Sequence, residues 1–121
     1  PAFHLDHLRH GVTTQWADTP IGAYLLNGYV ERGDSLDARS IGRVFEALQG
    51  SNLLEALPGC RTPTLVVNGE FDSARAAGEL TASLMSNATH HLMKGAGHCC
   101  FLEDPEAFDL AALEFLARNG L

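Results

Sequence analysis

The segment "TPTLVVNGEFD", residues 62–72, most constrains the fold of this chain. Its unbroken apolar run, Leu65–Val67, is bounded by Pro63 and Gly69, and such β-branched runs are typical of a parallel strand buried on both faces. A strand of this kind needs hydrogen-bonding neighbours along its edges and helices over its faces. The rest of the chain, or a partner, must supply those neighbours.

The residues after this strand predict one βαβ unit followed by a closing helix. A helix is expected over "SARAAGELTASLM", a second short strand over "ATHHLM", and a final helix capped by Asp104 with Pro105 in its first turn. The order strand, helix, strand implies a right-handed crossover between two adjacent parallel strands. We therefore expect the fold class to be α/β, with parallel strands and helices on both faces.

The sequence of residues 1 to about 57 predicts helices and loops, and no segment of it has the pattern of a strand. "DARSIGRVFEALQG" places apolar residues at the spacing of an amphipathic helix, "TPIGAYLLNG" predicts a helix from Thr19 to Gly28, and "SNLLEALPG" predicts a shorter one. These helices cannot supply strands to the open edges of a two-stranded sheet. We therefore expect the chain to be part of a larger α/β fold that another chain, or further residues, completes.

Bulk composition limits the partners of the protein. The net charge of −7 argues against nucleic acid and against an anionic membrane surface, since both favour basic proteins. No apolar run approaches the roughly 20 residues that span a bilayer, and we see no signal peptide. Three cysteines, two of them adjacent, predict reduced thiols rather than a disulfide framework, so we expect a cytoplasmic protein.

Both predicted strands deliver a titratable residue to the same edge of the sheet. Asp72 follows the first strand, and His98 follows the second through a Gly-Ala-Gly turn. Sites in open α/β sheets lie at the carboxyl ends of strands, so we expect the two side chains to meet. Alone, Asp72 could be a helix N-cap and His98 a loop histidine. Together they predict a dyad in which Asp72 orients the catalytic base His98.

The segments "CRTPTLVVNGEFD" and "GAGHCCFLEDPEAFDLAALEFL" resemble the C-terminal third of the α/β-hydrolase fold family. The resemblance covers residues 60–117. It implies that Asp72 and His98 are the acid and base of a Ser-Asp-His triad. It also implies that residues 58–121 form the C-terminal βαβα part of the core, and that residues 1–57 form a helical cap over an acyl pocket.

Aromatic residues of the expected cap could line that acyl pocket or form the cap's own core. We expect Trp16 and Tyr24 to contact the substrate and Phe45 to belong to the core, with Tyr29 left open between the two. The resemblance implies a small-molecule acyl substrate and no metal or organic cofactor.

The triad serine is not apparent in this sequence. In the family it precedes the Asp and the His, within Gly-x-Ser-x-Gly after a buried strand. Ser40, in "ARSIG", follows no such strand and is expected near a helix start, while "GDSL", residues 33–36, lacks the Asp-x-x-His that its own esterase family requires. We therefore expect the nucleophile on a partner, the N-terminal chain or fragment of the same hydrolase.

The expected function is hydrolysis of an ester, thioester, lactone or amide by nucleophilic acyl transfer. One alternative is a non-hydrolytic enzyme of the same fold, such as a lyase, an acyltransferase or a cofactor-free oxygenase. A second alternative is a ligand-binding homologue that has no catalytic serine. A covalent serine probe tests the first alternative, and sequencing the companion chain for Gly-x-Ser-x-Gly after an apolar strand decides the second.

Three weaker patterns offer other chemistry. Histidines recur at every third residue from His4 to His10, but steps of three drift around a helix and cannot easily share one metal. The adjacent cysteines after His98 lack the spacing of zinc ligands. An N-terminal proline can be a general base, yet Pro1 is not followed by the apolar strand that such proteins have. We expect no metal site.

Overall fold

The computed structural model describes residues 9–33, 37–50 and 53–121. The interpretations of Pro1, His4, His7 and most of "GDSL" fall outside these ranges. None of the helices in the described ranges is both long and apolar enough to cross a membrane.

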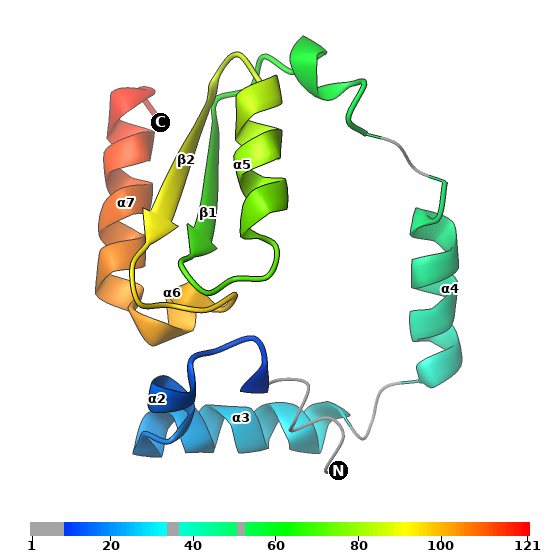
Figure 1. Ribbon diagram of the computed structural model, residues 1–121, viewed down its shortest axis with the longest axis vertical. Helices are drawn as coiled ribbons and strands as arrows, with labels where there is room; N and C mark the ends of the chain where they lie inside the picture. The colour runs from blue at the N-terminus through cyan, green and yellow to red at the C-terminus, as the bar shows by residue number, and fades with distance from the viewer. Residues whose placement is uncertain (1–8, 34–36, 51–52) are drawn as a thin grey trace.

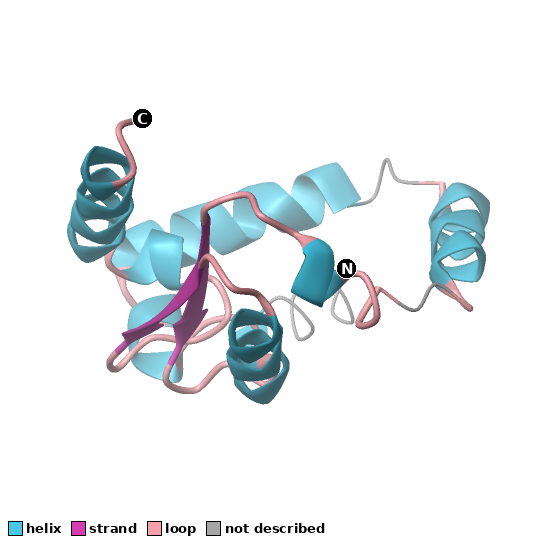
Figure 2. Ribbon diagram, turned by 90° about the horizontal axis from the view of Figure 1, so that it is seen from above, coloured by secondary structure: helices cyan, strands magenta, loops and turns pink. Residues whose placement is uncertain are grey.

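Two parallel strands form the centre of the second half. β1 (Thr64–Gly69) pairs with β2 (Ala88–Met93), from Thr64 opposite Ala88 to Gly69 opposite Met93. α5 (Arg75–Leu84) connects the strands, and α7 (Pro105–Arg118) follows them. The two helices flank the strands on opposite sides (Figures 1 and 2), which confirms the predicted α/β class.

The closing helix begins as the sequence predicts. The Asp104 side chain accepts a hydrogen bond from the Ala107 N–H at 3.0 Å, and Pro105 takes the first helical position. A short helix that the sequence pattern did not reveal, α6 (Cys100–Glu103), lies between the loop that carries His98 and α7. It packs the buried Cys100 against Met93 and Ala96, and Val67, Ala107 and Phe108 surround this small core.

The strands are less buried than their sequence predicts. Leu65, Val66 and Val67 are only half-buried, although a run of this kind is typical of a fully covered parallel strand. The reason is that, among the described residues, the sheet contains β1 and β2 alone, so each strand has a single neighbour. Such exposure is what a sheet that requires further strands should show.

Within the described ranges, the α-helices α2 (Thr14–Ala17), α3 (Pro20–Gly33) and α4 (Ala38–Leu48) precede the sheet. Thr19 caps α3 as predicted, since its Oγ1 accepts from the Gly22 N–H at 3.1 Å. The predicted end at Gly28 is wrong, because α3 continues to Gly33. Gly28 lacks the positive φ with which a terminal glycine ends a helix. Instead of the helix expected over residues 51–59, the described part holds a turn and the 3₁₀ helix η1 (Leu57–Gly59).

α4 lies apart from the other elements (Figure 1). Asp37 caps it, and Ser40 sits in its first turn, where its hydroxyl donates to Asp37 Oδ2 at 2.7 Å. The expectation that Phe45 belongs to a core is wrong in this structure, since Phe45 is 64% exposed. No described element covers the apolar stripe of this helix, which consists of Ile41, Val44, Phe45 and Leu48.

Candidate active site

The carboxyl ends of both strands point toward α6 and toward the helices α2 and α3 (Figure 1). β1 ends at Gly69, where the backbone passes so close to the loop after β2 that an added Cβ would collide with the carbonyl oxygens of Ala96 and Gly97. The Phe71 N–H donates to the same Ala96 oxygen at 2.9 Å. This close approach brings the residues after β1 beside the loop that carries His98.

A side chain at position 69 should therefore separate the two loops. We expect Gly69→Ala to lower the free energy of unfolding by about 1–3 kcal/mol, as overpacking against backbone does, measured by urea denaturation. Gly42→Ala on α4 is the matched control, because nothing lies within 4 Å of a Cβ there. An equal loss of stability in both variants would contradict the close approach.

Asp72 and His98 form the predicted pair. Asp72 Oδ1 lies 3.0 Å from His98 Nδ1, and the side chains are 2% and 62% exposed respectively. Asp72 Oδ1 also accepts from the Ala74 N–H at 2.8 Å, and Oδ2 accepts from Asn68 Nδ2 at 2.7 Å. The N-cap of α5 is Ala74, so Asp72 is not the cap of that helix. The sequence prediction that the two side chains meet is confirmed.

The hydrogen bonds to Asp72 determine its charge. Burial by itself raises the pKa of Asp72, but the hydrogen bonds from Asn68, the Ala74 N–H and His98 together outweigh it and hold the pKa below 3.8. Asp72 is therefore ionised at neutral pH, and an ionised carboxylate can only accept hydrogen bonds.

This charge fixes the tautomer of the neutral imidazole. His98 Nδ1 must donate to Asp72, so the lone pair is on Nε2. Among residues 9–33, 37–50 and 53–121, Nε2 has no hydrogen-bond partner. A buried anion that orients an exposed imidazole is the arrangement of a general base.

Glu103 joins the loop of His98 to the first half of the chain. Its Oε1 accepts from the Gly97 N–H at 2.7 Å, and its Oε2 accepts from the N–H of Thr13 at 3.0 Å and from the Thr13 hydroxyl. The Cys99 N–H donates to the Gly11 carbonyl at 2.7 Å. The sequence gives no sign of this role, since Glu103 is one acidic residue before a helix and no local pattern indicates a partner 90 positions away.

Both oxygens of Glu103 face N–H donors, so an amide cannot replace the carboxylate. We expect Glu103→Gln to cost about 1–3 kcal/mol, because its NH₂ group must face one of these donors. Hydrogen exchange should then accelerate at the Thr13 or Gly97 amide. Glu46→Gln on the exposed face of α4 is the control. Unchanged protection of both amides would contradict this connection.

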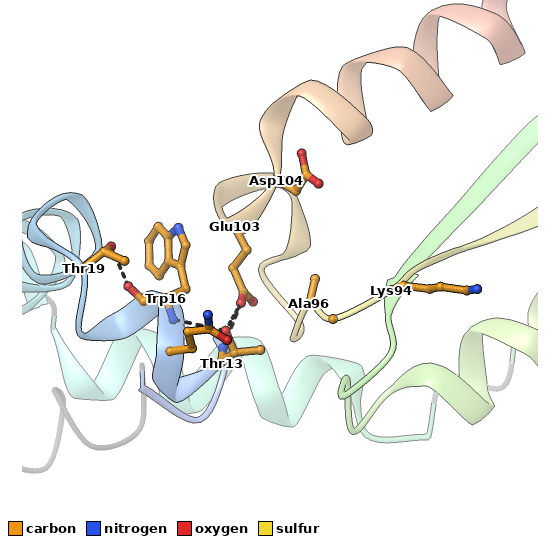
Figure 3. A pocket seen from close by; sticks show the side chains of 9 residues that line it. Thr13, Trp16, Thr19, Lys94, Ala96, Glu103 and Asp104 are labelled. Carbon is orange, nitrogen blue, oxygen red and sulfur yellow. Dashed lines mark hydrogen bonds between the residues drawn. The ribbon is translucent and has the colours of Figure 1, made fainter.

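A pocket of about 280 Å³ lies beside this connection (Figure 3). Thr13 and Trp16 line it from the first half of the chain, and Ala96 and Glu103 line it from the second half. The structure thus places Trp16 at a cavity beside the loop. Tyr24 is 74% exposed on α3 and does not line this pocket, nor do Asp72 and His98.

The cysteines beside His98 are poor nucleophiles. Burial raises the pKa of the Cys99 thiol, and the charges of Glu103 and Asp72 raise it further. Burial also raises the pKa of Cys100. Cys60, Cys99 and Cys100 are all free thiols, and in the described ranges no three His, Cys, Asp or Glu side chains are grouped as metal ligands.

Comparison with known proteins identifies the fold. No family model matches the sequence. The chain is 42% identical to Protein ABHD14A of Rattus norvegicus over 64 residues, which are 51% of this chain and 26% of that protein. It is 40% identical to Polyketide synthase ThaQ of Burkholderia thailandensis over 84 residues, which are 68% of this chain and 4% of that protein. The chain thus spans about a quarter, or less, of these relatives.

The structure is also similar to that of MenH from S. aureus. The TM-score is 0.57 at 23% identity, over 88% of this chain and 44% of that one. MenH and ABHD14A are α/β-hydrolase fold proteins. With two parallel strands, flanking helices and a helical segment before them, this chain has the fold of a C-terminal portion of an α/β-hydrolase.

Proposed function

We propose that this chain supplies the acid and base of a serine hydrolase that acts on an ester, thioester, lactone or amide. The observation that supports this most strongly is the 3.0 Å contact between buried Asp72 and exposed His98. The carboxylate needs burial to hold one imidazole orientation, and the imidazole needs exposure to reach a nucleophile and a substrate.

In the proposed reaction, a serine hydroxyl transfers its proton to His98 Nε2 while its oxygen attacks the carbonyl carbon. His98 then donates this proton to the leaving group as the carbon–heteroatom bond breaks. A water molecule repeats the sequence on the acyl-enzyme, releasing the acid and restoring the serine. Asp72 stays ionised throughout and stabilises the imidazolium.

We propose that the serine lies on a partner, the N-terminal chain or fragment of the same hydrolase. Within the described ranges, no serine is hydrogen-bonded to His98. Ser40 is bound to Asp37 in the first turn of α4, and Ser83 donates to the Leu80 carbonyl on α5. The incomplete burial of β1 and β2 is evidence for this proposal, because further strands from a partner would cover them.

We further propose that residues 1–57 are the helical cap and that residues 58–121 belong to the catalytic core. The contact between Thr13 and Glu103 supports this, since it holds the first half of the chain against the loop of His98. Trp16, which lines the adjoining pocket, is the stronger of the two expected substrate contacts, because Tyr24 points into solvent in this chain alone. The reduced thiols favour a cytoplasmic location.

A fluorophosphonate probe tests this function. It should label one serine on the partner within the assembled enzyme, and none on this chain, because only a serine activated by a base reacts readily. Boiled enzyme is the control for non-specific labelling. Ongoing turnover without label would favour a lyase or a cofactor-free oxygenase, in which His98 works without an acyl-enzyme.

An acyltransferase would label as well but would pass the acyl group to an acceptor other than water. Product analysis separates it from a hydrolase, since only hydrolysis incorporates oxygen from ¹⁸O-labelled water into the acid. A partner that lacks Gly-x-Ser-x-Gly and takes no label would leave a ligand-binding role for the assembly.

A further inference from the structure

A chain of polar contacts continues from Asp72 through the sheet. Asn68, near the end of β1, is only 7% exposed, and its Nδ2 donates to Asp72 Oδ2 at 2.7 Å. Its Oδ1 lies 3.0 Å from Nε2 of His90 on the adjacent strand β2. His90, Asn68, Asp72 and His98 are thus connected by successive contacts.

The charge of Asp72 determines the direction of each hydrogen bond in this series of contacts. The ionised carboxylate only accepts, so the NH₂ group of Asn68 must face it and the amide oxygen must face His90. His90 Nε2 must then carry a hydrogen. The neutral forms of the two histidines therefore have opposite tautomers, with hydrogen on Nε2 of His90 and on Nδ1 of His98.

α5 is shaped to leave room for Asn68. A Cβ added at Gly78, in this helix, would collide with Asn68 Oδ1. Gly78 does not have a positive φ, so its backbone gives no reason for glycine. Glycine inside a helix costs about 1 kcal/mol relative to alanine. Gly78 leaves space for the Asn68 amide, which explains why glycine stands at this helical position despite its cost in stability.

We infer that Asn68, held by His90, is a positioning residue for the dyad of Asp72 and His98. A carboxylate bound at one oxygen alone can turn about its Cβ–Cγ bond and lose its alignment with the imidazole. Asn68 occupies Oδ2, so Oδ1 stays directed at His98 Nδ1. The effect on catalysis rests on the proposed hydrolase function, whereas the effect on the tautomers does not.

The charge of Asp72 agrees with this inference. The hydrogen bond from Asn68 is the largest of the contributions that lower the pKa of Asp72 against the effect of burial. Removing Asn68 should raise the pKa of Asp72, which can be followed by ¹³C NMR of the carboxyl carbon. A variant that only loosened the strand would lose stability without this specific change.

The test compares four variants of the assembled enzyme by ¹⁵N NMR of the imidazoles and by steady-state kinetics. Asn68→Ala removes the whole contact. His90→Leu removes the donor to Asn68, whereas His90→Gln keeps an N–H that can reach it. His91→Leu is the matched control, since His91 is the next residue on β2 and its side chain points to the opposite face of the sheet.

We expect wild type to show His98 with hydrogen on Nδ1 and His90 with hydrogen on Nε2. In Asn68→Ala, His98 should populate both tautomers, and kcat should fall about 10- to 100-fold with little change in KM, as loss of a hydrogen bond to a charged group implies. His90→Leu should show a smaller loss that His90→Gln restores, and His91→Leu should match wild type.

Wild-type tautomers and kcat in both Asn68→Ala and His90→Leu would overturn the inference. If Asn68→Ala does not fold, the comparison of His90→Leu with His90→Gln decides alone. Altered tautomers in an assembly that never hydrolyses a substrate would support the positioning role and refute the hydrolase. Normal hydrolysis with unaltered tautomers would do the reverse.

Discussion

His98→Ala should lower kcat for ester hydrolysis by about 10⁴- to 10⁶-fold, the range seen when a triad base is removed. His98 Nε2 is the proposed acceptor of the serine proton, so this variant loses the group that activates the nucleophile. The imidazole is 62% exposed, so its removal takes away little packing. The measurement is steady-state hydrolysis of an activated aryl ester by the assembled enzyme.

The fold of this variant should be intact. Its circular dichroism spectrum and urea midpoint should match wild type within about 0.5 kcal/mol, as for most surface substitutions. His91→Ala controls for loss of an imidazole nearby in the sequence. Ester hydrolysis that survives in His98→Ala would refute the role of His98 as the base.

Asp72→Asn should lower kcat about 10⁴-fold, because an amide in this place can favour the wrong tautomer of the imidazole. An Asn side chain whose NH₂ faces His98 donates to Nδ1, which places the hydrogen on Nε2 and removes the lone pair that the serine needs. Near-normal kcat in this variant would mean that the contact with Asp72 does not set the tautomer.

The same variant has a predicted effect on acid stability. The pKa of Asp72 is lowered in the folded chain, so its ionisation stabilises the fold above the unfolded-state pKa near 3.8 and ceases to do so as pH falls through the folded value. Unfolding free energy should therefore fall less steeply with acid below about pH 4 in Asp72→Asn than in wild type, as measured by urea denaturation at a series of pH values. Parallel curves would contradict this.

The sequence predicted the elements around the site because their signals are local. The apolar run before Gly69 predicts β1, and Asp104 with Pro105 predicts the start of α7. Asp72 and His98 could be paired from the order of the elements alone, since adjacent parallel strands end at one edge. These inferences need nothing beyond the pattern of neighbouring residues and the handedness of the crossover.

The features of the structure that the sequence did not predict depend on contacts between distant residues. Glu103 meets Thr13 across 90 positions, and Asn68 meets His90 across 22, so no local spacing marks either pair. The length of α3 depends on the φ angle of Gly28, which the residue type does not determine. The exposure of Phe45 depends on what packs against α4, and that information is not contained in a helical pattern.

The most direct measurement is kcat of the assembled enzyme for an activated aryl ester in His98→Ala, Asp72→Asn and the double variant. If Asp72 acts only through His98, adding Asp72→Asn to His98→Ala should change kcat by less than about threefold, since residues that act as a unit are far from additive. A second loss approaching 10⁴-fold, equal to that of Asp72→Asn alone, would show that the two side chains act separately.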